Sequence, residues 1–148
     1  MKLYAYKIEN DKISTSHSDF YDKIVLKLSQ TSAIKLRCMT LNESSNEVDL
    51  LASYHMDNSK KVLFANIMRI APTREMPSLP PDFLNREEIS YSDLEGLNED
   101  EQKMTCKSSY YIVVNQNHLV TNLPKTSISR FKTYPKIRKQ SQWQSQWQ

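Results

Sequence analysis

The side chains that most readily bind zinc or act as nucleophiles belong to three histidines and two cysteines: His17, His55, His118, Cys38 and Cys106. Zinc sites usually take their ligands in close pairs such as C-x-x-C or H-x-x-x-H, and the sequence contains no such pair. A zinc site or a Cys106–His118 nucleophile would need the fold to bring distant residues together, and no oxyanion hole is evident. We therefore expect turn, strand-end and core roles for these residues, with no metal site and no cofactor.

Acidic residues offer a second kind of chemistry. Glu101-Gln102-Lys103 has the E-x-K spacing with which metal-dependent nucleases hold a metal ion and position water, and Asp93 could supply another carboxylate. In such enzymes the motif sits on a core strand, whereas here it lies in an acidic stretch expected to be loop or short helix. Asp49 and Asp57 form another candidate pair without further support. A small metal-dependent nuclease is thus an alternative, and a solvated surface is the favoured interpretation.

Glycine is nearly absent from the chain, which has one glycine, Gly96. Glycine lets a backbone close around a phosphate, because it tolerates left-handed conformations and close approach. The sequence therefore excludes a P-loop, a G-x-G-x-x-G dinucleotide turn and the G-x-S-x-G nucleophile elbow.

The net charge of +3 divides unevenly along the chain. Residues 125–148 contain six basic residues and no acidic ones. Basic side chains could neutralise phosphates, and the aromatic ones among them could stack on unpaired bases. Nucleic-acid binding by this arm is an alternative function, with these candidate residues: Arg130, Lys132, Lys136, Arg138, Lys139 and Trp143.

Residues 82–101 have the opposite character, with eight acidic residues against Arg86. Such an anionic stretch can dock on a basic partner, or it can simply be a solvated loop. We expect it to be lightly packed, with one short helix near Asn98 to Met104. The candidate protein-interaction residues come from this stretch and from the strand that follows: Asp93, Glu95, Glu99, Tyr110 and Tyr111.

The clearest structural signal is the stretch from Ser109 to Tyr134. Tyr110 to Val114 is a run of aromatic and β-branched residues, which predicts a strand. Asn115-Gln116-Asn117 predicts a turn, and His118 to Thr121 predicts the returning strand of a hairpin. Ser127 or Thr126 is expected to cap a short C-terminal helix that carries Ile128 and Phe131.

The residue patterns of the N-terminal half predict one helix and several strands. Residues 2–8 alternate as a first strand, and Ser16 or Ser18 is expected to cap a helix that runs to about Thr31. Residues 33–41 and 48–55 predict further strands. Residues 61–70 are apolar enough for either a buried strand or a short helix, and β-branched content favours the strand. Residues 71–81 hold four of the six prolines and predict a boundary.

These patterns predict one α+β domain over residues 1–134, with a Pro-rich and then acidic excursion at 71–101. Its core would be a single antiparallel sheet of about five or six strands, with one main helix packed on it and a short C-terminal helix. Residues 135–148 are expected to be a basic, low-complexity and disordered tail, because Ser-Gln-Trp-Gln occurs there twice in tandem.

The favoured function is a non-enzymatic protein-interaction protein of docking or inhibitor type, which binds another protein or itself through the hairpin edge or the acidic stretch. Its composition is typical of accessory proteins of bacterial mobile elements or prophages. No run of about 18 apolar residues occurs, and the N-terminus lacks a signal-peptide core, so a cytoplasmic location without membrane contact is expected.

Overall fold

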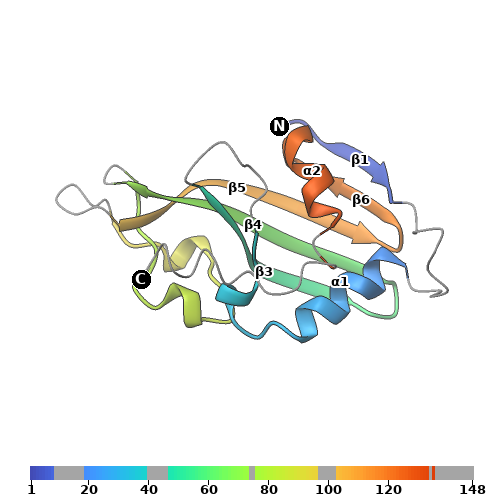
Figure 1. Cartoon of the computed structure of the whole chain (residues 1–148), viewed down its shortest axis with the longest axis horizontal. Coiled ribbons are helices and arrows are strands. Elements are labelled where there is room, and N and C mark those ends of the chain that lie inside the picture. Colours follow the sequence, from blue (N-terminus) through green and yellow to red (C-terminus); the bar gives the residue numbers. More distant parts are fainter. Residues whose placement is uncertain (9–18, 40–46, 74–75, 97–102, 134, 136–148) are drawn as a thin grey trace.

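Six strands form one antiparallel sheet in the computed structural model, which describes residues 1–8, 19–39, 47–73, 76–96, 103–133 and 135. The spatial order is β1-β6-β5-β4-β3-β2 (Figure 1). The strands are β1 (Tyr4–Lys7), β2 (Cys38–Met39), β3 (Val48–Asp57), β4 (Val62–Thr73), β5 (Lys103–Asn115) and β6 (His118–Thr121). The expected α+β class and the expected number of strands are confirmed.

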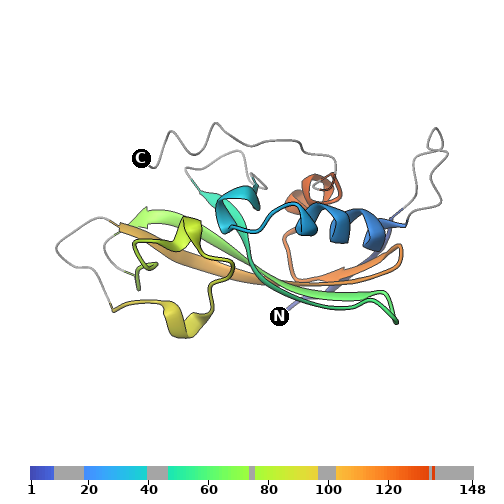
Figure 2. The ribbon, with the colours of Figure 1, turned by 90° about the horizontal axis from the view of Figure 1, so that it is seen from below.

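Two α-helices and three short 3-10 helices complete the described structure. The α-helices are α1 (Phe20–Ser29) and α2 (Lys125–Phe131), and the 3-10 helices are η1 (Ile34–Leu36), η2 (Phe83–Asn85) and η3 (Tyr91–Asp93). Figure 2 shows α1 and α2 on one side of the sheet, with the segment that contains η2 and η3 on the other. The two helices lie over the sheet toward its hairpin-turn end, and the segment with η2 and η3 lies near the opposite end.

The long strands β4 and β5 run past the boundary that the prolines predicted. β4 continues through Pro72 to Thr73, where Pro72 pairs with Met104 of β5. On its other side, the pairing of β4 with β3 already ends at Ile70. Pro72 is thus at a sheet edge among the described strands, where a residue without an N–H is tolerated. The predicted boundary at residues 71–81 begins too early for this reason.

Residues 33–41 differ from the strand that their alternation predicts. Ile34–Leu36 form η1, and only Cys38–Met39 pair with β3, opposite Leu50 and Asp49. Arg37 explains the change, because its buried guanidinium binds backbone carbonyls on three separate segments. Nε donates to Leu51 at 3.0 Å, Nη1 donates to Thr31 at 3.1 Å, and Nη2 donates to Glu87. This tertiary anchor outweighs the local preference for extended backbone.

Alternation along β4 divides the core into two clusters, because successive strand residues face opposite sides of a sheet. Leu63, Ala65 and Ile67 belong to a cluster that includes buried residues of α1 and α2. Met68 and Ile70 belong to the second cluster, with Leu79, Phe83 and Ile89 of the segment 76–96, among others. The second side of the sheet is thus covered only near one end within the described residues.

Residues 82–96 of the acidic stretch are mostly exposed, and a few buried residues anchor them to the sheet. Ile89 is fully buried, and its N–H donates to the carbonyl of Ala52 at 2.9 Å. Ala52 lies at an irregularity of β3 between Leu51 and Ser53, which leaves it without a strand partner. The expected helix near residues 98–104 falls mostly outside the described residues, although Lys103 and Met104 belong to β5.

Helix α1 begins one residue after Asp19, which caps it; the expected caps Ser16 and Ser18 lie outside the described residues. The Asp19 carboxylate accepts from the Asp22 N–H at 2.9 Å, and the Asp22 carboxylate accepts from the Asp19 N–H at 3.4 Å. Lys61 Nζ lies 3.1 Å from Asp19 and 3.2 Å from Asp22. This capping box fixes the start of the helix against the turn between β3 and β4.

Replacement of Asp19 by alanine should lower the free energy of unfolding by about 1 kcal/mol at pH 7. Partial burial alone would raise the pKa of Asp19, but hydrogen bonds from Asp22 and Lys61 lower it below the ordinary value of 3.8. The stabilisation is therefore present above that value and is lost as pH falls through the lowered pKa. Urea denaturation of both proteins at pH 7 and pH 3 tests this; an equal difference at both pH values would contradict it.

The β5–β6 hairpin forms as its sequence predicts, and its turn is bound to α1. The turn residue Gln116 has a positive φ of 51°, and its carbonyl accepts from the Tyr21 N–H at 3.0 Å. The Asn117 side chain accepts from the Phe20 N–H at 3.0 Å. These bonds satisfy N–H groups that the first turn of a helix leaves unpaired. The turn chemistry thus also sets the position of α1.

Helix α2 starts earlier than expected, and neither Ser127 nor Thr126 caps it. Pro124 is the N-cap residue, without a side-chain capping bond, and the helix covers Lys125–Phe131. Ser127 is instead buried, as are Ile128 and Phe131. The cap is dispensable because these buried contacts hold the short helix on the body of the protein.

Candidate interaction face

The side of the sheet opposite α1 and α2 carries a mainly apolar row of residues that crosses five strands. Cross-strand pairing places five residues side by side in this row: His55, Phe64, Val113, Val120 and Ala5. Their neighbours Leu63, Ala65, Ile112 and Val114 belong to the helix-side cluster, so the row faces the other way. We call this side of the sheet the open face. It comprises this row, Tyr111, and a second row made of Asp57, Val62, Asn115, His118 and Lys7.

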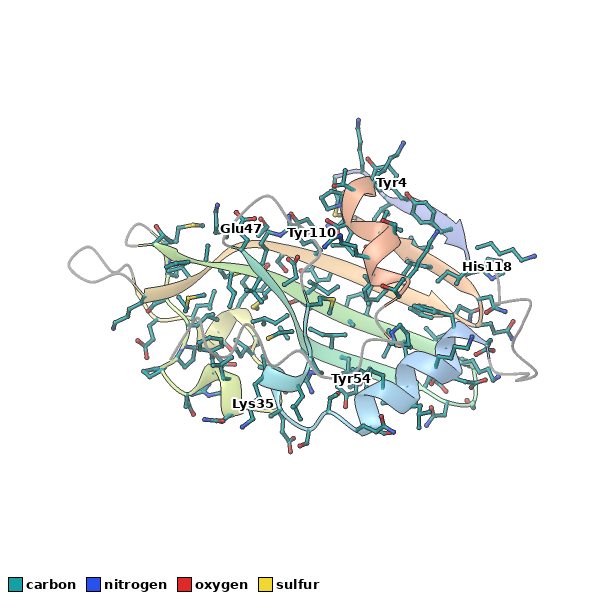
Figure 3. The ribbon with its side chains drawn as sticks, viewed as in Figure 1. Tyr4, Lys35, Glu47, Tyr54, Tyr110 and His118 are labelled. Carbon is teal, nitrogen blue, oxygen red and sulfur yellow. The ribbon has the colours of Figure 1, made fainter. Side chains whose placement is uncertain are left out.

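A second, polar row lies beside the apolar one at the turn end of the strands. It consists of Asp57, Val62, Asn115, His118 and Lys7, again in register across five strands. Lys7 and Asp57 carry opposite charges at the two ends of this row. Figure 3 labels His118 close to the hairpin turn, which marks this end of the sheet.

Two aromatic rings on the open face stack on each other while remaining accessible. The rings of Phe64 and Tyr111 lie 5.7 Å apart at an interplanar angle of 27°. Phe64 is 47% exposed, Tyr111 is 40% exposed and Val120 is 37% exposed. Aromatic side chains that are held in place and accessible lose little conformational entropy on binding, which favours them as anchors of interfaces.

Neither side of the β5–β6 hairpin is a free edge, which corrects the expectation that its edge could dock a partner. β4 pairs along β5, and β1 pairs along β6 from Tyr4 opposite Thr121 to Lys7 opposite His118. The N-terminal strand thus closes the hairpin. Sequence alone could not show this, because β1 and β6 are more than a hundred residues apart.

The two adjacent tyrosines that we expected to bind a partner point to opposite sides of the sheet. Tyr111 lies on the open face. Tyr110 lies on the helix side, where its hydroxyl accepts from Arg69 Nη1 at 3.3 Å and its ring lies 5.1 Å from the Arg69 guanidinium carbon. Only Tyr111 is therefore available to a partner on the open face.

Arg69 is the centre of a buried ionic network that sequence reasoning missed. Its Nε and Nη2 donate to the two carboxylate oxygens of Asp49 at 2.8 and 3.1 Å. Glu47 lies 3.7 Å from Arg69 Nε and accepts from Lys107 at 2.6 Å, and Ser127 of α2 accepts from Nη2 at 3.4 Å. Figure 3 labels Glu47 and Tyr110 at this network.

Burial of the Arg69 guanidinium disfavours its charged form, but Asp49, Tyr110 and Glu47 nevertheless raise its pKa. The network joins β3, β4, β5 and α2.

The acidic candidates differ: the carboxylate of Asp93 is bound within its own segment, that of Glu95 is exposed, and Glu99 lies outside the described residues. Asp93 accepts from the N–H and hydroxyl of Ser90 at 2.9 and 3.1 Å, and these bonds lower its pKa. The Glu95 N–H donates to Ser78, while its side chain is exposed. Glu99 and Glu101 lie outside the described residues. Lys103, the lysine of the E-x-K motif, is the first residue of β5.

Among the described residues, the histidine and cysteine candidates are not brought together; His17 lies outside these residues. Cys106 pairs with Ile70, whereas His118 lies opposite Asn115, nine residues further along β5 and so about 30 Å away. Burial raises the pKa of the Cys38 and Cys106 thiols, which disfavours the reactive thiolate. Across the described ranges, no group of three or more His, Cys, Asp or Glu residues could hold a metal ion.

Two of the basic nucleic-acid candidates fall on described residues. Arg130 is half-buried on α2, and Lys132 Nζ lies 4.9 Å from the centre of the Tyr6 ring on β1. Lys125 has a similar contact with Tyr4, at 5.3 Å. Lys136, Arg138, Lys139 and Trp143 lie outside the described residues. The described part of the basic arm is therefore attached to β1 by cation–π contacts.

Comparison of the chain with models of protein families, with curated proteins and with solved structures found no match. Among the described residues, no helix has the length and apolarity needed to cross a membrane.

Proposed function

We propose that this protein is a non-enzymatic interaction protein that docks on another protein chain through the open face. The observation that carries the proposal is the stacked and accessible pair Phe64 and Tyr111 in the middle of that face. On the helix side, the corresponding residues of the same strands are buried in the core. A sheet face with accessible aromatic and β-branched side chains gains free energy when a partner covers it.

The arrangement has the usual composition of an interface, with apolar residues at the centre and polar ones at the rim. Val113 is half-buried between Phe64 and Val120, so a partner would meet a continuous apolar row. The row of Lys7, His118, Asn115 and Asp57 lies beside it and could fix the orientation of the partner.

Site-specific photo-cross-linking tests the proposal. A benzophenone amino acid at position 111 is a conservative aromatic replacement on the open face, and the same replacement at Tyr91 is the matched control. Tyr91 is 54% exposed on η3, in the acidic segment. In cells that express the chain, we expect a discrete cross-linked product from position 111 and none from position 91. A product from position 91 alone would move docking to the acidic segment, and no product from either would contradict the proposal.

A second proposal, nucleic-acid binding by the basic arm, is supported by the six positive charges after residue 124. Because Phe131 and Ile128 are buried, the test must leave α2 intact and remove only residues 136–148. We expect the full chain to bind single-stranded oligonucleotides more weakly as salt rises, and the shortened chain to lose at least tenfold in affinity. An affinity that does not depend on the salt concentration, or that is the same in the shortened chain, would contradict this proposal.

A further inference from the structure

We propose that the partner of the open face is a second copy of this chain, in a face-to-face dimer with a two-fold axis that runs along β5. This inference rests on the proposed function and names the partner. It commits to an arrangement in which identical faces meet, as two-fold interfaces require.

The open face has β5 at its centre, with two strands on either side. On one side lie β4 and β3, and on the other lie β6 and β1. A two-fold axis in the interface plane and parallel to β5 exchanges these sides. It therefore places β1 of one copy over β3 of the other, while each row of residues stays opposite the same row.

Under this exchange the two charges of the polar row meet their opposites. Lys7 at one end would face Asp57 of the second copy, and the same pair would form again at the other end. An axis across the strands would instead place each strand over itself, and Lys7 would meet no acidic residue of the described face. Within the polar row, charge complementarity therefore favours the axis along β5.

The apolar row is also self-complementary in this arrangement. Val113 would meet Val113 of the second copy, and Phe64 would meet Val120. A large ring thus faces a smaller β-branched side chain, which allows the two rows to interdigitate as the inner faces of sandwiches do. His55 would meet Ala5 at the two ends of the row.

The size of the face sets the expected strength of the dimer. Five strands about 4.8 Å apart and three residue rows about 7 Å apart cover roughly 24 by 20 Å, or about 500 Å². Two copies would bury about 1,000 Å², which is near the lower limit for specific interfaces. We therefore expect a reversible dimer with a dissociation constant of roughly 1–100 μM.

Sedimentation equilibrium of the full chain across this concentration range tests the dimer, and a charge exchange tests its geometry. Lys7→Glu alone should weaken self-association at least tenfold, because it places like charges opposite each other twice. Asp57→Lys should do the same, but it also removes an acceptor of the Ser59 and Lys60 N–H groups in the β3–β4 turn, so recovery in the mixture below assigns its effect to the interface. An equimolar mixture of the two variants should recover the affinity to within a few-fold, because both contacts become attractive in the heterodimer. Lys2→Glu, with the same charge change outside the rows, should dimerise like the unchanged chain.

The outcomes separate this inference from the proposed function. A chain that stays monomeric up to about 100 μM, while position 111 cross-links to a different protein, would overturn the dimer and leave docking intact. Single variants that dimerise normally, or a mixture that recovers nothing, would overturn the geometry. Dimerisation only after removal of residues 136–148 would mean that the chain's own tail covers the face, which also overturns the inference.

Discussion

Replacement of Asp49 by alanine should lower the free energy of unfolding by about 3–5 kcal/mol, because it removes the carboxylate that is hydrogen-bonded to the buried Arg69 guanidinium and leaves the more distant Glu47, at 3.7 Å. Arg69 is 6% exposed and Asp49 is 1% exposed, so water cannot replace the lost partner. The two salt-bridging hydrogen bonds of 2.8 and 3.1 Å disappear together. Urea denaturation at pH 7, followed by circular dichroism, gives the difference directly.

Two further variants separate the burial of the charge from the loss of side-chain volume. Lys107→Gln removes an exposed member of the same network and should change stability by less than about 1 kcal/mol. The double variant Asp49→Leu, Arg69→Met removes both buried charges and should recover most of the loss, since apolar residues of similar size often replace a buried ion pair without penalty. If the double variant were as unstable as Asp49→Ala, an unpaired charge would not be the cause.

Replacement of Phe131 by alanine should also destabilise the fold, by about 3–5 kcal/mol. Phe131 is fully buried and meets the ring of Phe20 in an edge-to-face contact, with centroids 6.1 Å apart at an interplanar angle of 73°. The change removes this contact and leaves a cavity between α1 and α2. Since single domains are stable by only about 5–15 kcal/mol, the loss would be a large share of the total.

The matched control for Phe131→Ala is a chain that ends at Pro135. It keeps the whole of α2 and every residue of the described core, so it should unfold within about 1 kcal/mol of the full chain. Thermal unfolding of the three proteins makes the comparison. A shortened chain as unstable as the Phe131 variant would mean that residues 136–148 contribute to the core.

Local patterns predicted the elements whose conformation follows from the intrinsic preferences and spacing of their own residues. The β-branched and aromatic residues from Tyr110 to Val114, followed by a turn rich in Asn, were sufficient to predict the hairpin β5–β6. The same holds for Val62–Thr73, where β-branched content correctly favoured a strand over a helix. Helical spacing of Phe20, Ile24 and Leu28 likewise predicted α1, because this spacing puts apolar residues on one face.

Predictions failed where a distant residue changes the local outcome. Arg37 interrupts a regular alternation because its side chain binds carbonyls from three segments. Local composition likewise did not show that Phe83 and Ile89 would be buried in the second cluster, while most of the acidic stretch around them is exposed. The candidate site changed for the same reason: β1 covers the hairpin edge, and the accessible surface is the face of the sheet.

The sequence by itself determined the α+β class, the hairpin and the exclusion of glycine-dependent phosphate sites, since these depend on residue type and spacing along the chain. Only the tertiary structure decided that Asp49 pairs with Arg69 and not with Asp57. It also decided that Tyr110 binds Arg69 while Tyr111 is accessible. The strand register, finally, puts Lys7 and Asp57 at the two ends of one row. These relations arise from strand order and register. Order and register depend on pairing between residues far apart in the chain, which no local pattern encodes.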